Sequence, residues 1–481
     1  MVSVATGMIF SLLLTRQDIT GITKPDYGVW ANIFDLIAYF MLLVGALPFW
    51  VTRFVARGKE GAAKTGFLAN LVIGIISVAL YIPLVPLLTS ALDVSGTYLI
   101  LYFFAATQII NLYLINVLEA SLRAEKPEAV GYGLLIEEIC KILLAYVLMV
   151  RFQLQLLGAV ISLAVAVTIQ IVYYIKLTAH DFKYKIQWDY VKEWFKGSIT
   201  YIYYTVGNQL AAVVFIWLFV YGGQAARANF QAAFTIANIV TYASFLSFAL
   251  YPKLLAGKNV EDITSSMRMV LMFAIPMTAV AMSMPESFLI ILNESYAEAA
   301  PILLILAIDA FVMTVSQFYT YVLFGVEQLD QEAKIPLKQL VRSHIFKVFT
   351  LSYIHAMITL PIALCVLPNF ATDQPVLAPL YVGIINMVTR LAMFCVLYMI
   401  VRKSVKIIVP WSSVVKYVFA ALVMGILLYV LPHPSRITLT LGMAAVGVIV
   451  YLAILVAIDR ETRMLAITIV QEVKNRVFGT D

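Results

Sequence analysis

The chain has 481 residues, of which 62% are hydrophobic and 12% are charged, and its formal net charge at pH 7 is +6. A soluble chain of this length carries about twice that share of charged residues, so most of this chain must face lipid. Its positive charge is therefore no sign of a nucleic-acid partner. The three cysteines, Cys140, Cys365 and Cys395, lie inside apolar runs, which argues against a disulfide framework or a metal site.

Apolar runs recur along the whole sequence. A helix needs about 20 apolar residues to cross a hydrocarbon core about 30 Å thick. We predict fourteen membrane spans: Met1–Leu14, Val29–Val51, Gly66–Thr89, Thr97–Leu118, Gly131–Val150, Leu154–Ile175, Gly197–Tyr221, Phe230–Tyr251, Met269–Met284, Ala300–Leu323, Ile345–Leu367, Gln374–Val401, Ser412–Leu431 and Leu439–Ile458. The first run covers only about 21 Å. No basic segment precedes it, so we expect no cleaved signal peptide.

Basic residues fix the expected orientation of these spans. Most lysines and arginines fall in the even-numbered connections and in the C-terminal tail. Because basic loops stay in the cytoplasm, we expect both termini and the stretch Lys176–Lys196 to lie on the cytoplasmic side of the cell membrane. Four apolar residues recur in this stretch at helical spacing: Trp188, Val191, Trp194 and Phe195. That pattern predicts a helix in the membrane–water interface, with a solvated loop as the alternative.

The same stretch divides the spans into six before it and eight after it. We predict an N-lobe at 1–178, a cytoplasmic interfacial linker at 179–196, a C-lobe at 197–402, and two added spans with a cytoplasmic tail at 403–481. A short repeat supports two lobes, because Arg53-Phe-Val-Ala-Arg-Gly-Lys59 closes the second span and Lys253-Leu-Leu-Ala-Gly-Lys258 closes the eighth. Parallel repeats of this kind often flank a central substrate site.

Ionisable residues lie inside several predicted spans, where each costs at least about 2.5 kcal/mol and needs a partner or a cavity. Span five holds Glu137, Glu138 and Lys141. Their spacing allows either a self-neutralising pair or a lysine that faces the cavity beside a modulating carboxylate. Asp309 and Arg390 lie near the middle of spans ten and twelve. They either form a static pair or leave Arg390 to clamp a phosphate.

Other polar residues lie at similar depth. Asp35 is expected either to reach outward toward water or to bind a cation during exchange. His355 is expected either to pack through a hydrogen bond or to relay protons. Four uncharged residues complete the set: Gln108, Asn111, Asn208 and Gln209. Hydrogen bonds between helices explain such residues on their own, but together they also suit a cavity wet enough for sugar hydroxyls.

Three short passages carry a family resemblance: Thr15-Arg16 with Pro25-Asp26-Tyr27-Gly28, Arg53 to Lys59, and Ser121-Leu-Arg-Ala124 with Tyr132. They resemble the Wzx-type flippases of the multidrug/oligosaccharidyl-lipid/polysaccharide (MOP) exporter superfamily. Ile22-Thr23-Lys24 stands where that family often has Leu-Gly before its acidic turn. The resemblance implies an all-α, MATE-like polytopic fold of about fourteen transmembrane helices, arranged as two six-helix lobes with two further C-terminal helices.

The expected function is a flippase that moves a lipid-linked oligosaccharide to the outer leaflet by alternating access. Lys141 and Arg390 would bind its anionic head, and the four uncharged residues would bind sugar. Glu137, Glu138, Asp309, Asp35 and His355 would serve coupling or charge pairing. The expected partners are this substrate, membrane lipids, a coupling Na⁺ or H⁺, and glycan polymerase or transferase machinery.

Two alternatives stay open. The first is an ion-coupled exporter of organic cations with the same fold, which would need unpaired carboxylates in the first lobe. The second is a membrane-embedded glycan polymerase or ligase, which would need a sizeable outward loop with catalytic residues. No such loop, nucleophile–base pair, zinc spacing or phosphate-cradling glycine loop appears in the sequence. We therefore expect neither an enzyme nor a bound metal or cofactor.

Overall fold

The structure is a computed structural model that describes residues 2–247, 260–326, 343–405, 407–464, 467, 468 and 471. All regular elements in these residues are helices, so the predicted all-α fold is confirmed. The chain divides into two compact units. The first holds the described residues of 1–231 and 349–382, and the second holds those of 232–326, 343–348 and 383–471. These units are defined by contacts between residues, whereas the predicted lobes are defined by chain order. The lobe boundaries remain a prediction.

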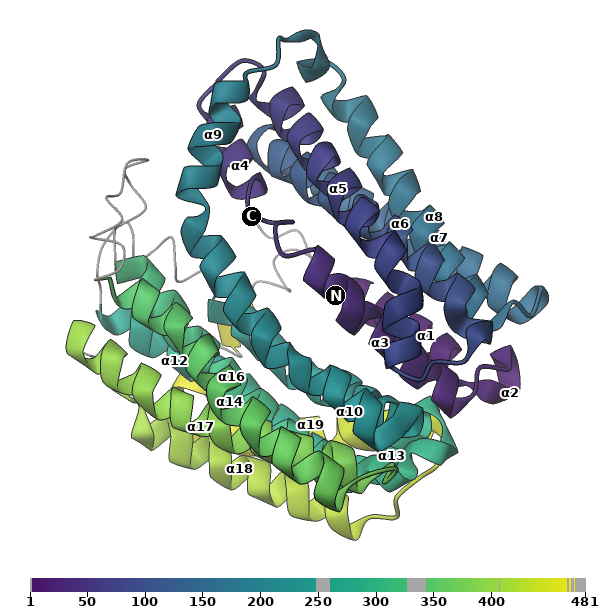
Figure 1. Cartoon of the computed structure of the whole chain (residues 1–481). Coiled ribbons are helices and arrows are strands. Elements are labelled where there is room, and N and C mark those ends of the chain that lie inside the picture. The colour runs from purple at the N-terminus through teal and green to yellow at the C-terminus, as the bar shows by residue number, and fades with distance from the viewer. Residues whose placement is uncertain are drawn as a thin grey trace. The chain divides into compact units, whose positions relative to one another are not determined.

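The first unit is built on eight helices and their short connections. They are α1 (Val2–Thr15), α2 (Gln17–Thr20), α3 (Lys24–Phe40), α4 (Pro48–Ala56), α5 (Ala62–Ala91), α6 (Leu99–Glu125), α7 (Pro127–Ala145) and α8 (Gln155–Thr178), with η1 (Gly96–Tyr98), η2 (Tyr146–Arg151) and η3 (Asp181–Lys183) between them. Helices α5, α6, α7 and α8 lie side by side (Figure 1). The unit also includes α9 (Trp188–Gly197), α10 (Ile199–Ala237) as far as Gln231, and α16 (His344–Phe370) from Phe349 onward.

The second unit contains the later helices. They are η4 (Asn238–Ser247), α12 (Val260–Ser283), α13 (Pro285–Leu292), η5 (Glu294–Ala299), α14 (Ala300–Val326), the greater part of α17 (Leu377–Ser404), α18 (Trp411–Val430) and α19 (Ile437–Ile458). Helix α12 packs against α14, α18 and α19. The hydroxyl of Tyr451 in α19 donates to the carbonyl of Met272 in α12 at 2.8 Å. The last two helices are therefore packed parts of this unit.

Ten helical segments in the described residues are long and apolar enough to cross a membrane. The difference from fourteen predicted spans has a structural cause in each case. Helix α1 is short, span two is broken into α3 and α4, α7 carries several charges, and spans seven and eight are counted as one continuous segment. Within the described residues, every predicted span contains helical structure, and the expected count of about fourteen is consistent with this fold.

The break in span two has a local cause. Helix α3 begins with a capping box, in which Thr23 and Asp26 satisfy each other's backbone N–H groups. It ends at Phe40, and seven residues in turns precede α4, which has Pro48 in its first turn. Proline lacks an N–H donor and is favoured at a helix start. The single predicted span Val29–Val51 is therefore two helices in the structure.

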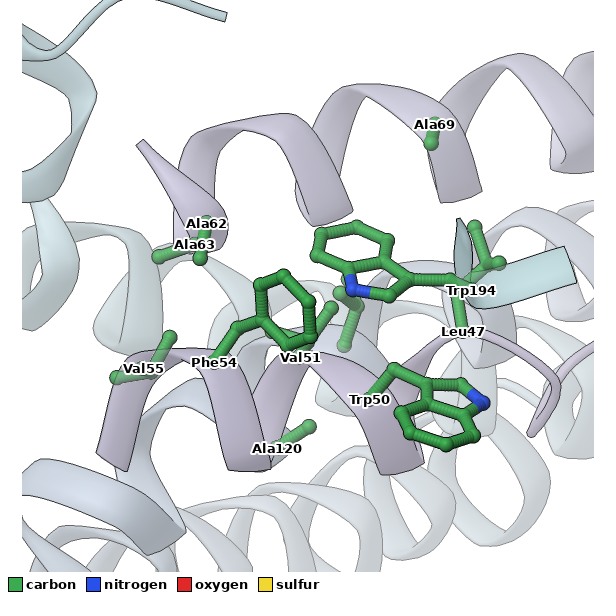
Figure 2. Close-up of a cluster of buried hydrophobic side chains, with 11 residues drawn as sticks. Leu47, Trp50, Val51, Phe54, Val55, Ala62, Ala63, Ala69, Ala120 and Trp194 are labelled. Carbon is green, nitrogen blue, oxygen red and sulfur yellow. The ribbon is translucent and has the colours of Figure 1, made fainter. Parts of the chain in front are cut away.

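The predicted interfacial linker forms α9, but its most buried residue faces protein. Trp194 is fully buried, and it packs with Trp50 and Phe54 of α4 and with alanines of α5 (Figure 2). Trp188 at the start of α9 is 54% exposed. The helix therefore docks on α4 and α5 through Trp194, while the exposed Trp188 stays available for contact with lipid headgroups. The second copy of the basic repeat, Lys253–Lys258, lies outside the described residues.

Candidate functional site: charge clusters within the membrane-spanning helices

The first charge cluster lies on α7, as its spacing predicts. Lys141 Nζ lies 3.1 Å from Glu137 Oε1 and 2.7 Å from Glu138 Oε2, and only the first contact has hydrogen-bond geometry. The three residues are 7–8% exposed. The ring of Phe10 in α1 lies 5.9 Å from the ammonium. Two carboxylates surround one ammonium, so Lys141 must exchange partners before it can hold an anion.

The second cluster joins Asp35 of α3 to Arg227 of α10. Arg227 Nε donates to Asp35 Oδ2 at 2.7 Å, and its Nη2 donates to Oδ1 at 3.0 Å. Its Nη1 donates to Gln231 Oε1 at 3.0 Å. Arg227 is only 4% exposed. A bidentate pair of this kind fixes both side chains in one geometry, and Asp35 neither reaches toward water nor stands unpaired in this structure.

The path of α10 brings Arg227 into place. Gly223 interrupts the helix with φ 81° and ψ 175°, a backbone conformation that glycine adopts readily. The helix resumes beyond it, and Arg227 lies about one turn further on. The rings of Phe215 and Phe230 lie 5.5 and 5.9 Å from the guanidinium carbon. Aromatic faces attract this cation, so they help to hold it away from water.

The third cluster lies in the second unit. Arg390 Nε of α17 donates to Asp309 Oδ1 of α14 at 2.6 Å. The arginine side chain is 33% exposed, whereas the aspartate side chain is 12% exposed. The two residues therefore form the pair that the sequence suggested. The partly exposed guanidinium keeps donor capacity beyond the Nε contact.

The uncharged candidates do not gather in one cluster. Asn111 Nδ2 donates to the carbonyl of Ala164 in α8 at 3.0 Å, which is a hydrogen bond between helices. Asn208 is exposed and accepts from Ser352 of α16 at 2.8 Å. The backbone carbonyl of Gln209 accepts from Tyr39 at 3.2 Å. Gln108 is 3% exposed, and its Nε2 has no hydrogen-bond partner in the part of the chain that the structure describes.

His355 lies in α16, where Nδ1 is 3.3 Å from the hydroxyl of the buried Thr359 one turn later. This contact fits the packing interpretation of a membrane histidine. Sequence reasoning missed Arg227, because it assigned residues 222–229 to a loop between spans seven and eight. Asp35 was the available signal, since a buried carboxylate requires a cation nearby.

Comparison with known proteins shows the fold. No protein-family model matches the sequence, and no curated protein matches it. Among solved structures, the lipid II flippase MurJ in an inward closed conformation aligns over 95% of this chain and 98% of its own, with TM-score 0.65 and 14% identity. An inward-facing multidrug resistance MATE family transporter covers 84% of this chain and 95% of its own, with TM-score 0.63 and 13% identity.

A third solved structure is a MOP superfamily transporter from Pyrococcus furiosus. It covers 83% of this chain and 92% of its own, with TM-score 0.55 and 14% identity. These similarities define the class of fold: the chain has the polytopic, MATE-like fold of the MOP superfamily transporters. They confirm at this level the resemblance that the short sequence passages suggested.

Proposed function

We propose that this protein is a flippase that translocates a lipid-linked oligosaccharide from the inner to the outer leaflet of the cell membrane. The observation that carries the proposal is the extent of the structural match. The lipid II flippase aligns over 95% of the chain, whereas the MATE transporter aligns over 84%. We predict fourteen spans for this chain. That number favours a flippase of this fold, whereas twelve spans would favour an exporter.

The intramembrane charges also suit a substrate with an anionic head and a hydrocarbon tail. A polyprenyl-phosphate sugar needs cations for its phosphate, polar groups for its sugar, and an opening toward lipid for its tail. Arg390 is the best-placed cation, because its side chain is 33% exposed beside Asp309 and a guanidinium can hold phosphate oxygens bidentately. Lys141 is a second cation, available once it exchanges a carboxylate for phosphate. Alternating access would then carry the head across for glycan or glycoprotein synthesis.

The test uses cells depleted of this protein and a membrane-impermeant sugar probe. We expect the completed lipid-linked oligosaccharide to accumulate on the cytoplasmic leaflet, and the wild-type chain to reverse the accumulation. Two variants replace every charged residue of one cluster with a neutral residue, so that binding is tested with little disturbance of folding. They are Glu137→Gln/Glu138→Gln/Lys141→Met and Asp309→Asn/Arg390→Gln. Each removes a whole cluster, so no buried charge is left alone. Absence of accumulation in depleted cells would contradict the proposal.

The second candidate is an exporter of organic cations. One observation favours it: the α7 cluster places two carboxylates around one ammonium in the first unit. One discriminating experiment removes α18 and α19. Retained transport of organic cations by the truncated chain would favour an exporter that works with twelve spans. Cation sensitivity in depleted cells, without accumulation of lipid-linked sugar, would favour the exporter.

A further inference from the structure

We propose that Asp35 and Arg227 form a latch that holds α3 against the part of α10 beyond Gly223 and that parts during each transport cycle. The inference rests on the proposed function only in assuming that the two predicted lobes move. Asp35 belongs to the predicted N-lobe, and Arg227 belongs to the predicted C-lobe. The pair joins residues 192 positions apart in the chain, on either side of the linker.

The geometry of the pair is that of a strong contact. Both acceptor atoms of Asp35 are used, at 2.7 and 3.0 Å from the guanidinium. Arg227 is 4% exposed, so water does not screen the interaction. A buried charge left without its partner is strongly unfavourable. The contact therefore favours one arrangement of α3 and α10 and resists a gradual drift away from it.

Near the pair, the backbones of α3 and α10 lie very close together. A side-chain carbon at Gly28 of α3 would lie 1.9 Å from the carbonyl oxygen of Gln224, so only glycine fits there. Further along α3, Tyr39 donates to the carbonyl of Gln209 in α10. Small residues at helix crossings allow such close packing in membranes. Together with Asp35–Arg227, these contacts form a seam that joins the two helices at three places.

Gly223 supplies a hinge beside this seam. Its φ is 81°, and nothing lies within 4 Å of the position that a side-chain carbon would occupy. The segment that carries Arg227 can therefore change direction without a steric clash at this residue. The other two clusters cannot play the same part: the α7 cluster lies on one helix, and Asp309 and Arg390 both belong to the predicted C-lobe.

The experiment measures the distance between α2 and the turn after α16, which is tied to α10. Spin labels are placed at Asp18→Cys and Thr372→Cys in a full chain in lipid nanodiscs, with Cys140, Cys365 and Cys395 replaced by serine. Asp18 has a 63% exposed side chain. Thr372 is exposed, and in the same turn the carbonyl of Pro375 accepts from Asn229 Nδ2 of α10, beyond Gly223, at 2.7 Å. Both labels lie in the first unit.

We expect Asp35→Asn and Arg227→Gln each to shift the distance distribution toward longer values. The charge swap Asp35→Arg/Arg227→Asp should move it back toward the wild-type distribution. Arg151→Gln is the matched control, since Arg151 is exposed and stacks only on Tyr146 of its own turn in the described contacts. This control should leave the distribution unchanged.

A wild-type distribution in both single variants would overturn the latch. A charge swap that behaves like the single variants would overturn it too, because the shift would then come from packing. If Arg227→Gln does not fold, Arg227→Lys keeps the charge without the planar fork, and an intermediate shift is expected. The distance is measured without substrate, so failure to transport a lipid-linked oligosaccharide would leave this test intact.

Discussion

At the scale of single residues, the intramembrane charges are arranged as compensating groups. Lys141 lies between two buried carboxylates on its own helix, whereas Arg227 and Arg390 each pair with one carboxylate on another helix. Removing the cation from the α7 cluster would leave Glu137 and Glu138 buried together. Breaking a buried pair from one side costs about 3–5 kcal/mol, because an unpaired charge remains in a low-dielectric site.

We therefore predict that Lys141→Ala lowers the free energy of unfolding by about 3–5 kcal/mol. The matched control is Lys176→Ala, whose side chain is exposed at the end of α8, and its effect should stay within about 0.5 kcal/mol. Thermal unfolding of purified protein in one detergent checks both. Equal effects of the two variants would show that the α7 cluster contributes little to the fold.

Residue spacing predicted some of these pairs and not others. Glu137 and Lys141 are four apart, so one helix face brings them together whatever the tertiary structure. Asp309 and Arg390 could be matched by depth, because both lie near the middle of their spans. Arg227 could not, since Gly222 and Gly223 made its surroundings look like a loop. Its partnership with Asp35 depends on a crossing of α3 and α10 that no periodicity encodes.

At the scale of helices, α9 shows how an amphipathic pattern leaves its partner open. The spacing of Trp188, Val191, Trp194 and Phe195 predicted a helix with one apolar face. In the structure Trp194 meets Trp50 and Phe54 rather than lipid, and its ring lies 5.5 Å from that of Phe54 (Figure 2). Hydrophobicity does not distinguish a lipid surface from a protein surface.

We predict that Trp194→Ala destabilises the protein by about 3–5 kcal/mol, because it empties a closed apolar site. Trp188→Ala removes the same ring from a residue that is 54% exposed, and its effect should be much smaller. Limited proteolysis near Lys183 and Lys185, together with thermal unfolding, measures the undocking of α9. Faster cleavage in Trp188→Ala than in Trp194→Ala would contradict this docking.

Asp459 ends α19 outside the membrane-spanning segment. Burial raises the pKa of its carboxyl, but hydrogen bonds from Lys416 and Thr462 and the charge of Lys416 outweigh burial and hold the pKa below its usual range. A carboxyl whose pKa is lowered on folding stabilises the folded state above its unfolded pKa of about 4. This contribution is lost as the pH falls through the lower, folded value.

We predict that Asp459→Asn is less stable than wild type at pH 7 and that the difference shrinks as the pH falls below about 4. Thermal unfolding across this range measures it. Asp93→Asn, on an exposed turn, is the matched control and should be close to wild type at every pH. A difference that grows in acid would have the wrong sign for a lowered pKa.

At the scale of the whole molecule, hydropathy was enough to predict the all-α fold but not the break of one predicted span into α3 and α4. Each apolar run must form a helix, because lipid cannot satisfy free backbone polar groups. Which helices contact one another is a different question, since lipid-facing and buried faces are equally apolar. The packing of α18 and α19 illustrates this: chain order made them additions, whereas α18 packs against α12 and Tyr451 of α19 donates to Met272 of α12.

We predict that a chain ending after α17 is largely misfolded or aggregated, because the face of α12 that packs against α18 and α19 would lose these two helices. Size-exclusion profiles of the truncated chain measure this, and Tyr451→Phe is the mild control. That variant removes one hydrogen bond, worth about 1 kcal/mol. A monodisperse, transport-competent truncation would show that the twelve remaining spans suffice, and would favour the cation exporter.

The most direct test of the central claim is made with purified protein in liposomes. A fluorescent polyprenyl-pyrophosphate oligosaccharide is placed in both leaflets, and a membrane-impermeant quencher reports the fraction that reaches the outside. We predict that the full chain speeds this movement, and that the neutral variant Asp309→Asn/Arg390→Gln slows it while remaining folded. Movement no faster than in protein-free liposomes, with transport of organic cations by the same preparation, would contradict the account.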